Sequence, residues 1–394
     1  MEITEAFASL RCLDCDATHD PTTAGRCPDC DGPLDPRYDH DPGAVTRGGL
    51  DADQADGLEA FAEVLPFPAE ALVTAGEGGT PLVEVPGLAD ELGVRAVYLK
   101  DEGRNTTGSA TDRGMALAVT AARELGAADV ALPSMGNGGQ SAAAYAARAG
   151  LGSHSFVPSR VPFVNKAMVN VHGGEMAVVE GRYADAAEVF VDATAEEGWH
   201  PVGPFQTPYR HEGTKTLAYE TARQLDWTVP DAVVYPTGHG TGLVGLRKGG
   251  RDLLEWGLAE AEPRLYAAQA DGCAPVVRAW DADEQRHEAW DYPDTICGPL
   301  EIPDPVGGAH ALDAIAATDG GAIGTSDEEI LAGAVALAEA GVTMGATGGA
   351  AVSGARALTD RGAFDDDDVV VLVNAVTGNK EADLLRSHLM SKGV

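Results

Sequence analysis

The sequence predicts an α/β fold in which parallel sheets are covered by helices. Short apolar runs typical of buried strands alternate with longer alanine-rich stretches of helical periodicity along most of the chain. Such alternation favours parallel strands that are joined by helical crossovers. With 394 residues, 44% of them hydrophobic, the chain can bury a large core in two lobes and carry a small appendage.

The individual elements follow from these patterns. Strands are predicted at the apolar runs 96–100, 130–132, 155–157, 232–235, 264–268 and 369–373. Helices are predicted at the periodic stretches 52–64, 114–125, 139–149, 182–196, 215–225, 328–340 and 350–360. No internal repeat of solenoid period is present, so a repeat architecture is not expected.

A short polar segment rich in Asp, Pro and Gly, residues 1–42, precedes the α/β region. It carries two CxxC pairs separated by eleven residues, formed by Cys12, Cys15, Cys27 and Cys30. Two such pairs place four thiolates on tight turns, as a tetrahedral zinc site requires, and four protein ligands make the zinc structural rather than catalytic. Two disulfides are the alternative, which a reducing cytoplasm disfavours. We therefore predict a module that needs zinc in order to fold.

The charge balance excludes two classes of partner. The chain has 27 basic and 62 acidic residues, a formal net charge of −35, which repels nucleic-acid phosphates and anionic lipid headgroups. Acidic residues are spread along the whole chain, which favours a salt-adapted protein over an ordinary acidic one. We find neither an apolar leader nor a run of about 18 apolar residues, so we expect a cytoplasmic protein with no membrane partner.

Six short motifs follow one another in an order that resembles the threonine synthase family. They are GEGGTPL at 76–82, LKDEGRNTTGSATDRGMA at 99–116, SMGNGGQSAAAYAARAG at 134–150, PYRHEGTKTLAYE at 208–220, PTGHGTGLVG at 236–245 and TGNK at 377–380. Some members of that family also have a zinc-ribbon-like N-terminal segment. The resemblance implies a two-lobed fold-type II pyridoxal-phosphate enzyme domain at 43–394, with a smaller lobe at roughly 115–205 and a larger lobe formed by the remainder, preceded by a zinc ribbon at 1–42.

The resemblance also implies a chemistry, from which the chain departs at one position. In the family, pyridoxal phosphate forms an imine with a lysine, and the enzyme converts phosphohomoserine to threonine and phosphate. The family pattern NPTGSFKDRG matches residues 105–114 and places Thr111 at the lysine. A hydroxyl cannot form the imine, nor can it move the substrate's α-proton as an amine does. Because the DRG that follows Thr111 is retained, the chain resembles a divergent paralogue without the cofactor lysine.

The resemblance assigns further site positions. The family's STGN loop corresponds to Ser134, Met135 and Gly136 for the substrate and to Asn137 for the cofactor ring, with Met135 in place of a threonine. The loop for the cofactor phosphate comprises Gly238, His239, Gly240, Thr241 and Gly242, in which His239 stands in place of a glycine. The partner of the pyridine nitrogen falls on Ala375, or on Thr377 after a local shift.

Three hypotheses follow. The first is a paralogue that lost the imine chemistry and now binds an amino-acid or phosphate-bearing ligand, regulates a partner, or has no function. The second is an active threonine synthase or serine/threonine dehydratase. It either uses another lysine, with Lys215 the first to consider, or carries Thr111 as a deliberate substitution. The third, a zinc-dependent nucleic-acid binder, conflicts with the acidic charge. Several site positions differ together, which favours the first; a homodimer is implied by the family alone.

Overall fold

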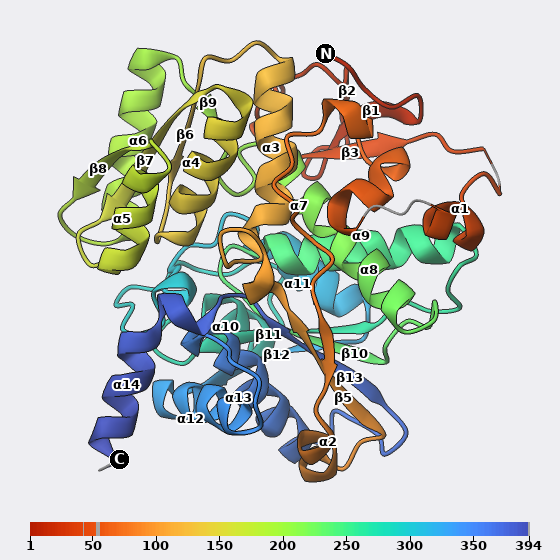
Figure 1. Cartoon of the computed structure of the whole chain (residues 1–394), viewed down its shortest axis with the longest axis vertical. Coiled ribbons are helices and arrows are strands. Elements are labelled where there is room, and N and C mark those ends of the chain that lie inside the picture. The colour runs from red at the N-terminus through yellow and green to blue at the C-terminus, as the bar shows by residue number, and fades with distance from the viewer. Residues whose placement is uncertain (42, 53–55, 393–394) are drawn as a thin grey trace. The chain divides into compact units, whose positions relative to one another are not determined.

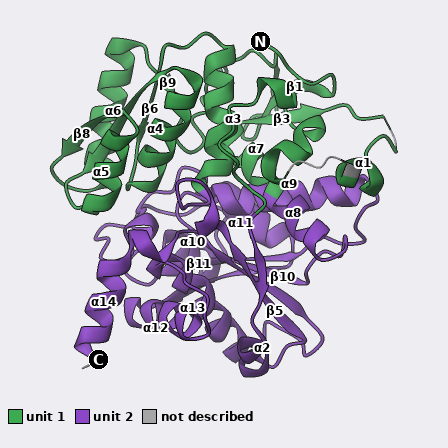
Figure 2. Ribbon diagram, viewed as in Figure 1, with its two compact units in different colours: residues 1–79, 111–216 green, residues 80–110, 217–394 purple. Residues whose placement is uncertain are grey.

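The computed structural model describes residues 1–41, 43–52 and 56–392 (Figure 1). It contains two compact units, one formed by residues 1–79 and 111–216 and the other by residues 80–110 and 217–394 (Figure 2). We call them unit 1 and unit 2. The predicted last residue of the N-terminal module, Pro42, lies outside the described residues, and the lobe limits near residues 115 and 205 stay a prediction.

Unit 1 contains a four-stranded parallel sheet of order β8-β7-β6-β9. Its strands are β6 (Asp129–Pro133), β7 (Gly152–Pro158), β8 (Glu175–Val179) and β9 (His200–Pro201). Its longer helices are α3 (Thr111–Glu124), α4 (Asn137–Ala149), α5 (Phe163–Val171) and α6 (Tyr183–Glu197). Helix and strand alternate from β6 to β9, so this part of the chain forms the parallel crossovers that the sequence predicts.

The N-terminal segment of unit 1 forms a small antiparallel sheet of order β2-β1-β3. Its strands are β1 (Phe7–Cys12), β2 (Thr18–His19) and β3 (Leu34–Tyr38). Cys12 ends β1 and lies opposite Leu34 at the start of β3, so the cysteine turns meet at one end of this sheet. The other short elements of the unit are α1 (Arg47–Ala52), α7 (Tyr209–Thr214) and the 3₁₀ helices Gly57–Val64 and Ala69–Ala71.

Unit 2 contains a six-stranded sheet of order β12-β11-β10-β13-β5-β4. The strands are β4 (Leu82–Glu84), β5 (Ala96–Asp101), β10 (Ala232–Pro236), β11 (Arg264–Ala270), β12 (Gly321–Thr325) and β13 (Val369–Asn374). All neighbours pair in parallel except β4, which runs antiparallel at one edge. The helices are α2 (Pro86–Leu92), α8 (Thr216–Gln224), α9 (Thr241–Glu255), α10 (Pro275–Asp281), α11 (Gly308–Ala317), α12 (Asp327–Glu339), α13 (Ala346–Asp360) and α14 (Ala382–Ser391), with 3₁₀ turns at Glu102–Arg104, Gly298–Leu300 and Gly378–Lys380.

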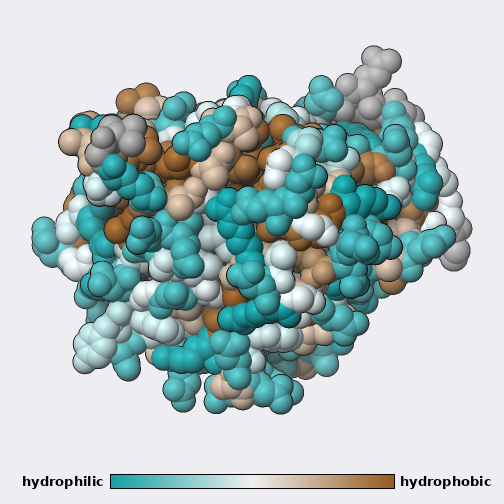
Figure 3. All heavy atoms as spheres, turned by 90° about the horizontal axis from the view of Figure 1, so that it is seen from below, coloured by the Kyte–Doolittle hydropathy of each residue, from teal (hydrophilic) through white to brown (hydrophobic). Residues whose placement is uncertain are grey.

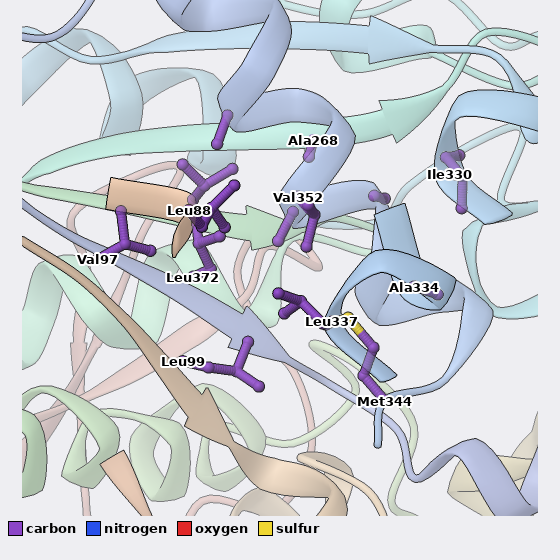
Figure 4. Close-up of a cluster of buried hydrophobic side chains, with 14 of the residues drawn as sticks. Leu88, Val97, Leu99, Ala268, Ile330, Ala334, Leu337, Met344, Val352 and Leu372 are labelled. Carbon is purple, nitrogen blue, oxygen red and sulfur yellow. The ribbon is translucent and has the colours of Figure 1, made fainter. Parts of the chain in front are cut away.

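Helices cover both faces of this sheet because successive strand residues point to opposite sides. On β13, for example, Leu372 packs with α2, α12 and α13, whereas Val371 and Val373 pack with α8 to α11. Figure 4 shows the first of these clusters, in which Leu88, Val97, Ile330 and Met344 belong to one buried group. A strand that is buried on both faces is apolar throughout, which is why its sequence shows a continuous run rather than alternation.

The structure confirms parallel sheets covered by helices and all six predicted strands, each within a few residues of its predicted ends. Six predicted helices are found, whereas the described part of the stretch 52–64 contains a 3₁₀ helix at Gly57–Val64. Helix α9 and strand β12 are among the elements that were not predicted. Glycines are frequent in both, at four positions of α9 and two of β12, and glycine is a poor former of either structure.

The surface agrees with the composition. On the face shown in Figure 3, hydrophilic residues are spread widely and hydrophobic ones are scattered among them. Within the described residues, no helix is both long and apolar enough to cross a bilayer.

Candidate functional site

Thr111 is the first residue of α3, and the three residues after it are buried in unit 1. The Ser141 hydroxyl on α4 donates to the Asp112 carboxylate at 2.6 Å, and Arg113 Nη1 donates to Thr216 Oγ1 at 3.1 Å. A Cβ on Gly114 would overlap the carbonyl oxygen of Arg210 on α7. These contacts hold the first turn of α3 at a fixed position, so the frame around Thr111 has structural roles of its own.

Another buried carboxylate of unit 1, Glu77, belongs to the first motif. It accepts hydrogen bonds from the Ala75 amide at 2.9 Å and from the Tyr145 hydroxyl on α4 at 2.8 Å. Desolvation by burial raises the pKa of Glu77 above its usual range. The glutamate therefore ties the start of the GEGGTPL segment to the middle of α4.

The loop between β6 and α4 carries the four predicted residues from Ser134 to Asn137. The Ser134 hydroxyl accepts hydrogen bonds from the amides of Gly136, at 3.0 Å, and Gly139, at 2.9 Å, so it caps the start of α4. Gly136 has φ +116°, and a Cβ there would lie 2.8 Å from Nδ2, the side-chain nitrogen of Asn165. That nitrogen donates to Asn137 Oδ1 at 3.0 Å and fixes the orientation of Asn137. Met135 is largely buried.

In unit 2, the other predicted positions follow neighbouring strands of one sheet. Strand β13 lies between β10 and β5, and all three are parallel. The loop 238–242 follows β10, the segment 375–377 follows β13, and residues 102–110 follow β5. The carboxyl ends of parallel strands share one edge of a sheet, where ligands of α/β proteins bind. The sheet therefore brings these three segments to the same edge.

The glycine-rich loop leads into α9, a helix of 15 residues. Gly240 caps the helix with φ +91°, and a Cβ on Gly242 would overlap the ring of Tyr235. A Cβ on Gly238 would lie 2.9 Å from the Pro299 carbonyl oxygen, so the scaffold requires glycine at each of these positions. Backbone amides at the start of a helix attract anions. His239 is partly exposed, and its carbonyl oxygen accepts a hydrogen bond from the amide of Gly307.

The segment that leads into Thr111 pairs with the closing segment of unit 2. The Ala110 amide donates to the Ala375 carbonyl oxygen at 2.9 Å, and the Thr377 amide donates to the Gly108 carbonyl oxygen at 2.9 Å. A Cβ on Gly108 would lie 2.6 Å from the methyl carbon of Thr377. Ala375 and Thr377 are both partly exposed. Thr111 thus directly follows Ala110, the residue whose amide is bound to the Ala375 carbonyl oxygen.

Two lysines are fully buried in ion pairs. Lys100 is paired with Glu220 and donates to the Thr80 carbonyl oxygen and to Gln224 Oε1, each at 2.7 Å. Lys215, which the sequence put first as a substitute for the missing amine, lies 2.5 Å from Glu212 Oε1 and 4.2 Å from the centre of the Tyr38 ring. Both amines therefore have structural roles within their own units.

Lys380 has a different environment. It is buried, and its Cε lies 3.7 Å from the position that a Cβ on Gly108 would take. Its side chain consequently runs beside the segment that leads into position 111. The sequence motif alone gave Lys380 no such preference over Lys215.

The four cysteines of the N-terminal module form a compact cluster. Their sulfur atoms lie within 4.8 Å of one another, with 3.5 Å between Cys12 and Cys30 and 3.8 Å between Cys15 and Cys27. Zinc–sulfur bonds of about 2.3 Å in a tetrahedron give sulfur separations of about 3.8 Å, so the cluster fits zinc. All six cysteines of the chain are free thiols, which disfavours the disulfide alternative.

Two further observations concern this cluster. The hydrogen bond with Cys15 raises the pKa of Cys30 to about 12, because crowded thiols resist ionisation unless a cation is present. His19, which sequence reasoning did not single out, has Nε2 at 3.3 Å from the Cys27 sulfur. The spacing of the CxxC pairs gives no signal for this histidine, because β2 brings it to the cluster.

Comparison with known proteins gives a consistent result. Residues 73–375 match the family described as pyridoxal-phosphate dependent enzyme. The chain is 35% identical to threonine synthase of Methanosarcina acetivorans over 315 residues, which are 79% of this chain and 77% of that protein. It is 32% identical to threonine synthase of Methanocaldococcus jannaschii over 378 residues, which are 95% and 93% of the two chains.

Solved structures show the same fold at lower identity. Processed threonine deaminase isoform 2 of Solanum lycopersicum superposes with a TM-score of 0.67 and 20% identity, over 80% of this chain and 83% of that one. L-serine ammonia-lyase of Rhizomucor miehei gives a TM-score of 0.68 and 20% identity, over 79% and 97%. At this identity, the likeness concerns the fold alone.

Proposed function

The chain belongs to the pyridoxal-phosphate-dependent enzyme family, as a threonine-synthase-like member of fold-type II, and on this premise we propose that it is a paralogue impaired in catalysis or repurposed. The family makes pyridoxal phosphate the expected cofactor and a small amino-acid compound the expected ligand. In our proposal the cofactor binds without a covalent lysine link. Threonine formation from phosphohomoserine, the family reaction, is then lost or greatly slowed.

The observation that carries the proposal is Thr111 within an intact frame. Asp112, Arg113 and Gly114 each make a buried contact in unit 1, which leaves no room for a shifted register. This supports a lysine that is replaced by Thr111 rather than displaced along the helix. A threonine hydroxyl has no proton affinity near neutral pH with which to take and return an α-proton. Position 111 can offer a hydrogen bond and nothing more.

Other residues support noncovalent binding. The bound cofactor supplies an electron-withdrawing ring beside the amino-acid nitrogen. Amides of the loop 238–242 at the start of α9 would hold its phosphate, with His239 next to them. Asn137, whose oxygen already accepts from Asn165, would donate its amide hydrogens to a ring oxygen. Ala375 offers the pyridine nitrogen no partner, and the nearest hydroxyl along the chain is that of Thr377. These roles fit the ring and the phosphate but not covalent attachment.

The test is to trap any lysine link. We would purify the protein with pyridoxal phosphate, reduce it with borohydride and locate the adduct by peptide mass spectrometry. Parallel samples would carry Thr111→Lys and, as a control of similar size without an amine, Thr111→Met. We expect no specific adduct in the native chain or in Thr111→Met, and a single adduct at position 111 in Thr111→Lys.

An adduct on one specific lysine of the native chain would overturn the proposal in favour of an active threonine synthase or serine/threonine dehydratase. The position of Lys380 beside Gly108 makes it the first candidate in that case. Lys380→Met should then abolish the adduct, whereas Lys166→Met should not, because the Lys166 amine is bound to the Ser159 carbonyl oxygen at 2.8 Å.

We further propose that the four cysteines bind structural zinc, that the protein forms a homodimer, and that it works in a salt-rich cytoplasm. The sulfur geometry supports the first point, the family the second, and the net charge of −35 the third. Metal analysis and light scattering at low and high salt test them directly.

A further inference from the structure

The N-terminal module is joined to α7 through two side chains that are fully buried. His211 Nε2 lies 3.0 Å from Asp35 Oδ1, and the Tyr38 hydroxyl donates to Glu212 Oε1 at 2.5 Å. Asp35 and Tyr38 both belong to β3, and all of these residues lie in unit 1. Without Asp35, the buried Nε2 of His211 would lose its partner, and Glu212, which is also paired with Lys215, would lose the hydrogen bond from Tyr38; both losses are costly in a buried place. The order of α7 therefore depends on β3.

Strand β3 depends in turn on the cysteine cluster. It begins directly after the second cysteine turn, and its first residue, Leu34, lies opposite Cys12. Asp35 is the next residue along the strand. A Cβ on Gly32 would lie 2.8 Å from the Cys12 sulfur, so the chain enters β3 in contact with the cluster. A module of about 40 residues has too small a core to fix such a strand without a metal or another cross-link.

Helix α7 in turn interlocks with the first turn of α3. A Cβ on Gly213 would overlap the Arg113 carbonyl oxygen, and a Cβ on Gly114 would overlap that of Arg210. Each glycine thus faces the backbone of the other helix at close range. Helix α7 has only six residues, and a helix this short is not stable without tertiary contacts. Because β3 stabilises α7, and α7 packs against the first turn of α3, β3 indirectly stabilises the turn that begins at Thr111.

From this chain of contacts we infer that the N-terminal module is a metal-dependent latch. The latch consists of the four-cysteine cluster, β3, α7 and the first turn of α3, residues 111–114. With the metal bound, β3 satisfies His211 and Glu212, and α7 holds the turn at position 111. When the metal leaves, β3 loosens, α7 opens locally, and the ligand site loses one of its fixed edges. The inference rests on the proposed zinc binding and does not depend on the fate of the imine chemistry.

Hydrogen exchange of the full-length protein tests the latch. Zinc content would be measured before and after treatment with a chelator, and amide exchange would be followed by mass spectrometry in both states. We expect exchange in α7 and at 111–114 to accelerate by at least about tenfold after zinc removal, with no change in β10 of unit 2. A change confined to residues 7–38 would overturn the inference, and so would a protein that takes up no zinc.

A pair of tyrosine variants tests the route of transmission with zinc still bound. Tyr38→Phe removes the hydroxyl that reaches Glu212 but keeps the ring beside Lys215. Tyr266→Phe removes a similar hydroxyl in unit 2, which donates to the Ala363 carbonyl oxygen at 3.3 Å. We expect exchange in α7 to accelerate severalfold in the first variant alone. Unchanged exchange in Tyr38→Phe with a full zinc content would exclude this route, and the imine experiment would still decide the proposed function separately.

Discussion

The cysteine cluster and the first turn of α3 lie in the same unit and differ in what each retains. In the cluster, all four sulfur atoms lie within 4.8 Å of one another, so the set of four ligands that a zinc site needs is complete. At the start of α3, Asp112, Arg113 and Gly114 have buried contacts, but the position that the family pattern gives to the lysine holds a partly exposed threonine. Asp112, Arg113 and Gly114 take part in the packing of unit 1, and this packing accommodates a threonine at position 111.

The frame at α3 should be the most sensitive part of this comparison. Gly114→Ala places a methyl group against the Arg210 backbone, which cannot move without separating α3 from α7. We expect a loss of about 3 kcal/mol or more in the free energy of unfolding, measured by denaturant titration. A loss below about 0.5 kcal/mol would mean that the frame is not tightly packed and that Thr111 is free to shift.

The cluster should be next in effect. Cys30→Ser removes one of four ligands, and we expect zinc to fall from about one ion per chain to near zero, with a loss of roughly 2–4 kcal/mol in stability. Metal analysis and thermal unfolding measure the two effects. Retained zinc would show that another group completes the site. His19, which lies beside Cys27, is the first candidate, and His19→Ala in the same background would then release the ion.

The contribution of the buried Glu77 to the free energy of unfolding should depend on pH. Tyr145→Phe removes a hydrogen bond to its carboxylate, which we expect to cost about 1–3 kcal/mol at pH 8. Burial raises the folded-state pKa of Glu77 above the ordinary 4.5, so its contribution to stability falls as pH rises from 4.5 through the raised pKa. The lost bond stabilised the charged form, and the cost of Tyr145→Phe should therefore shrink at pH 5. An equal cost at both values would contradict this assignment.

The smallest expected effect provides a matched control for Gly114→Ala. Gly87 lies in the first turn of α2, has an ordinary φ, and nothing lies within 4 Å of the position of its Cβ. Gly87→Ala should raise the free energy of unfolding by about 0.4–1 kcal/mol, because alanine loses less backbone entropy on folding. Denaturant titration of both variants under one condition compares the same substitution in a closed and an open environment. A destabilised Gly87→Ala would show that this environment is not open.

Much of the fold could be predicted because its signals are local. A strand such as β13 is a continuous apolar run, and helices such as α12 begin at a recognisable cap, Ser326, and keep their periodicity. The limits of prediction appear in α9, whose glycines at 242, 245, 249 and 250 hide a helix that packing imposes. Gly242 is required there by the ring of Tyr235, which belongs to the preceding strand. In such a segment, tertiary contacts outweigh the low helix propensity of glycine.

The same division holds for the candidate site. The sequence by itself determined the four-cysteine pattern and predicted Thr111 at the position of the family's lysine, because both are matters of residue type at fixed spacing along the chain. Only the tertiary structure decided that Lys215 is held by Glu212, that Ser134 caps α4, and that His211 pairs with Asp35. The last two residues are separated by 176 positions, and no local pattern links them. Covalent spacing fixes which groups are available, whereas burial and long-range contacts decide which partners those groups find.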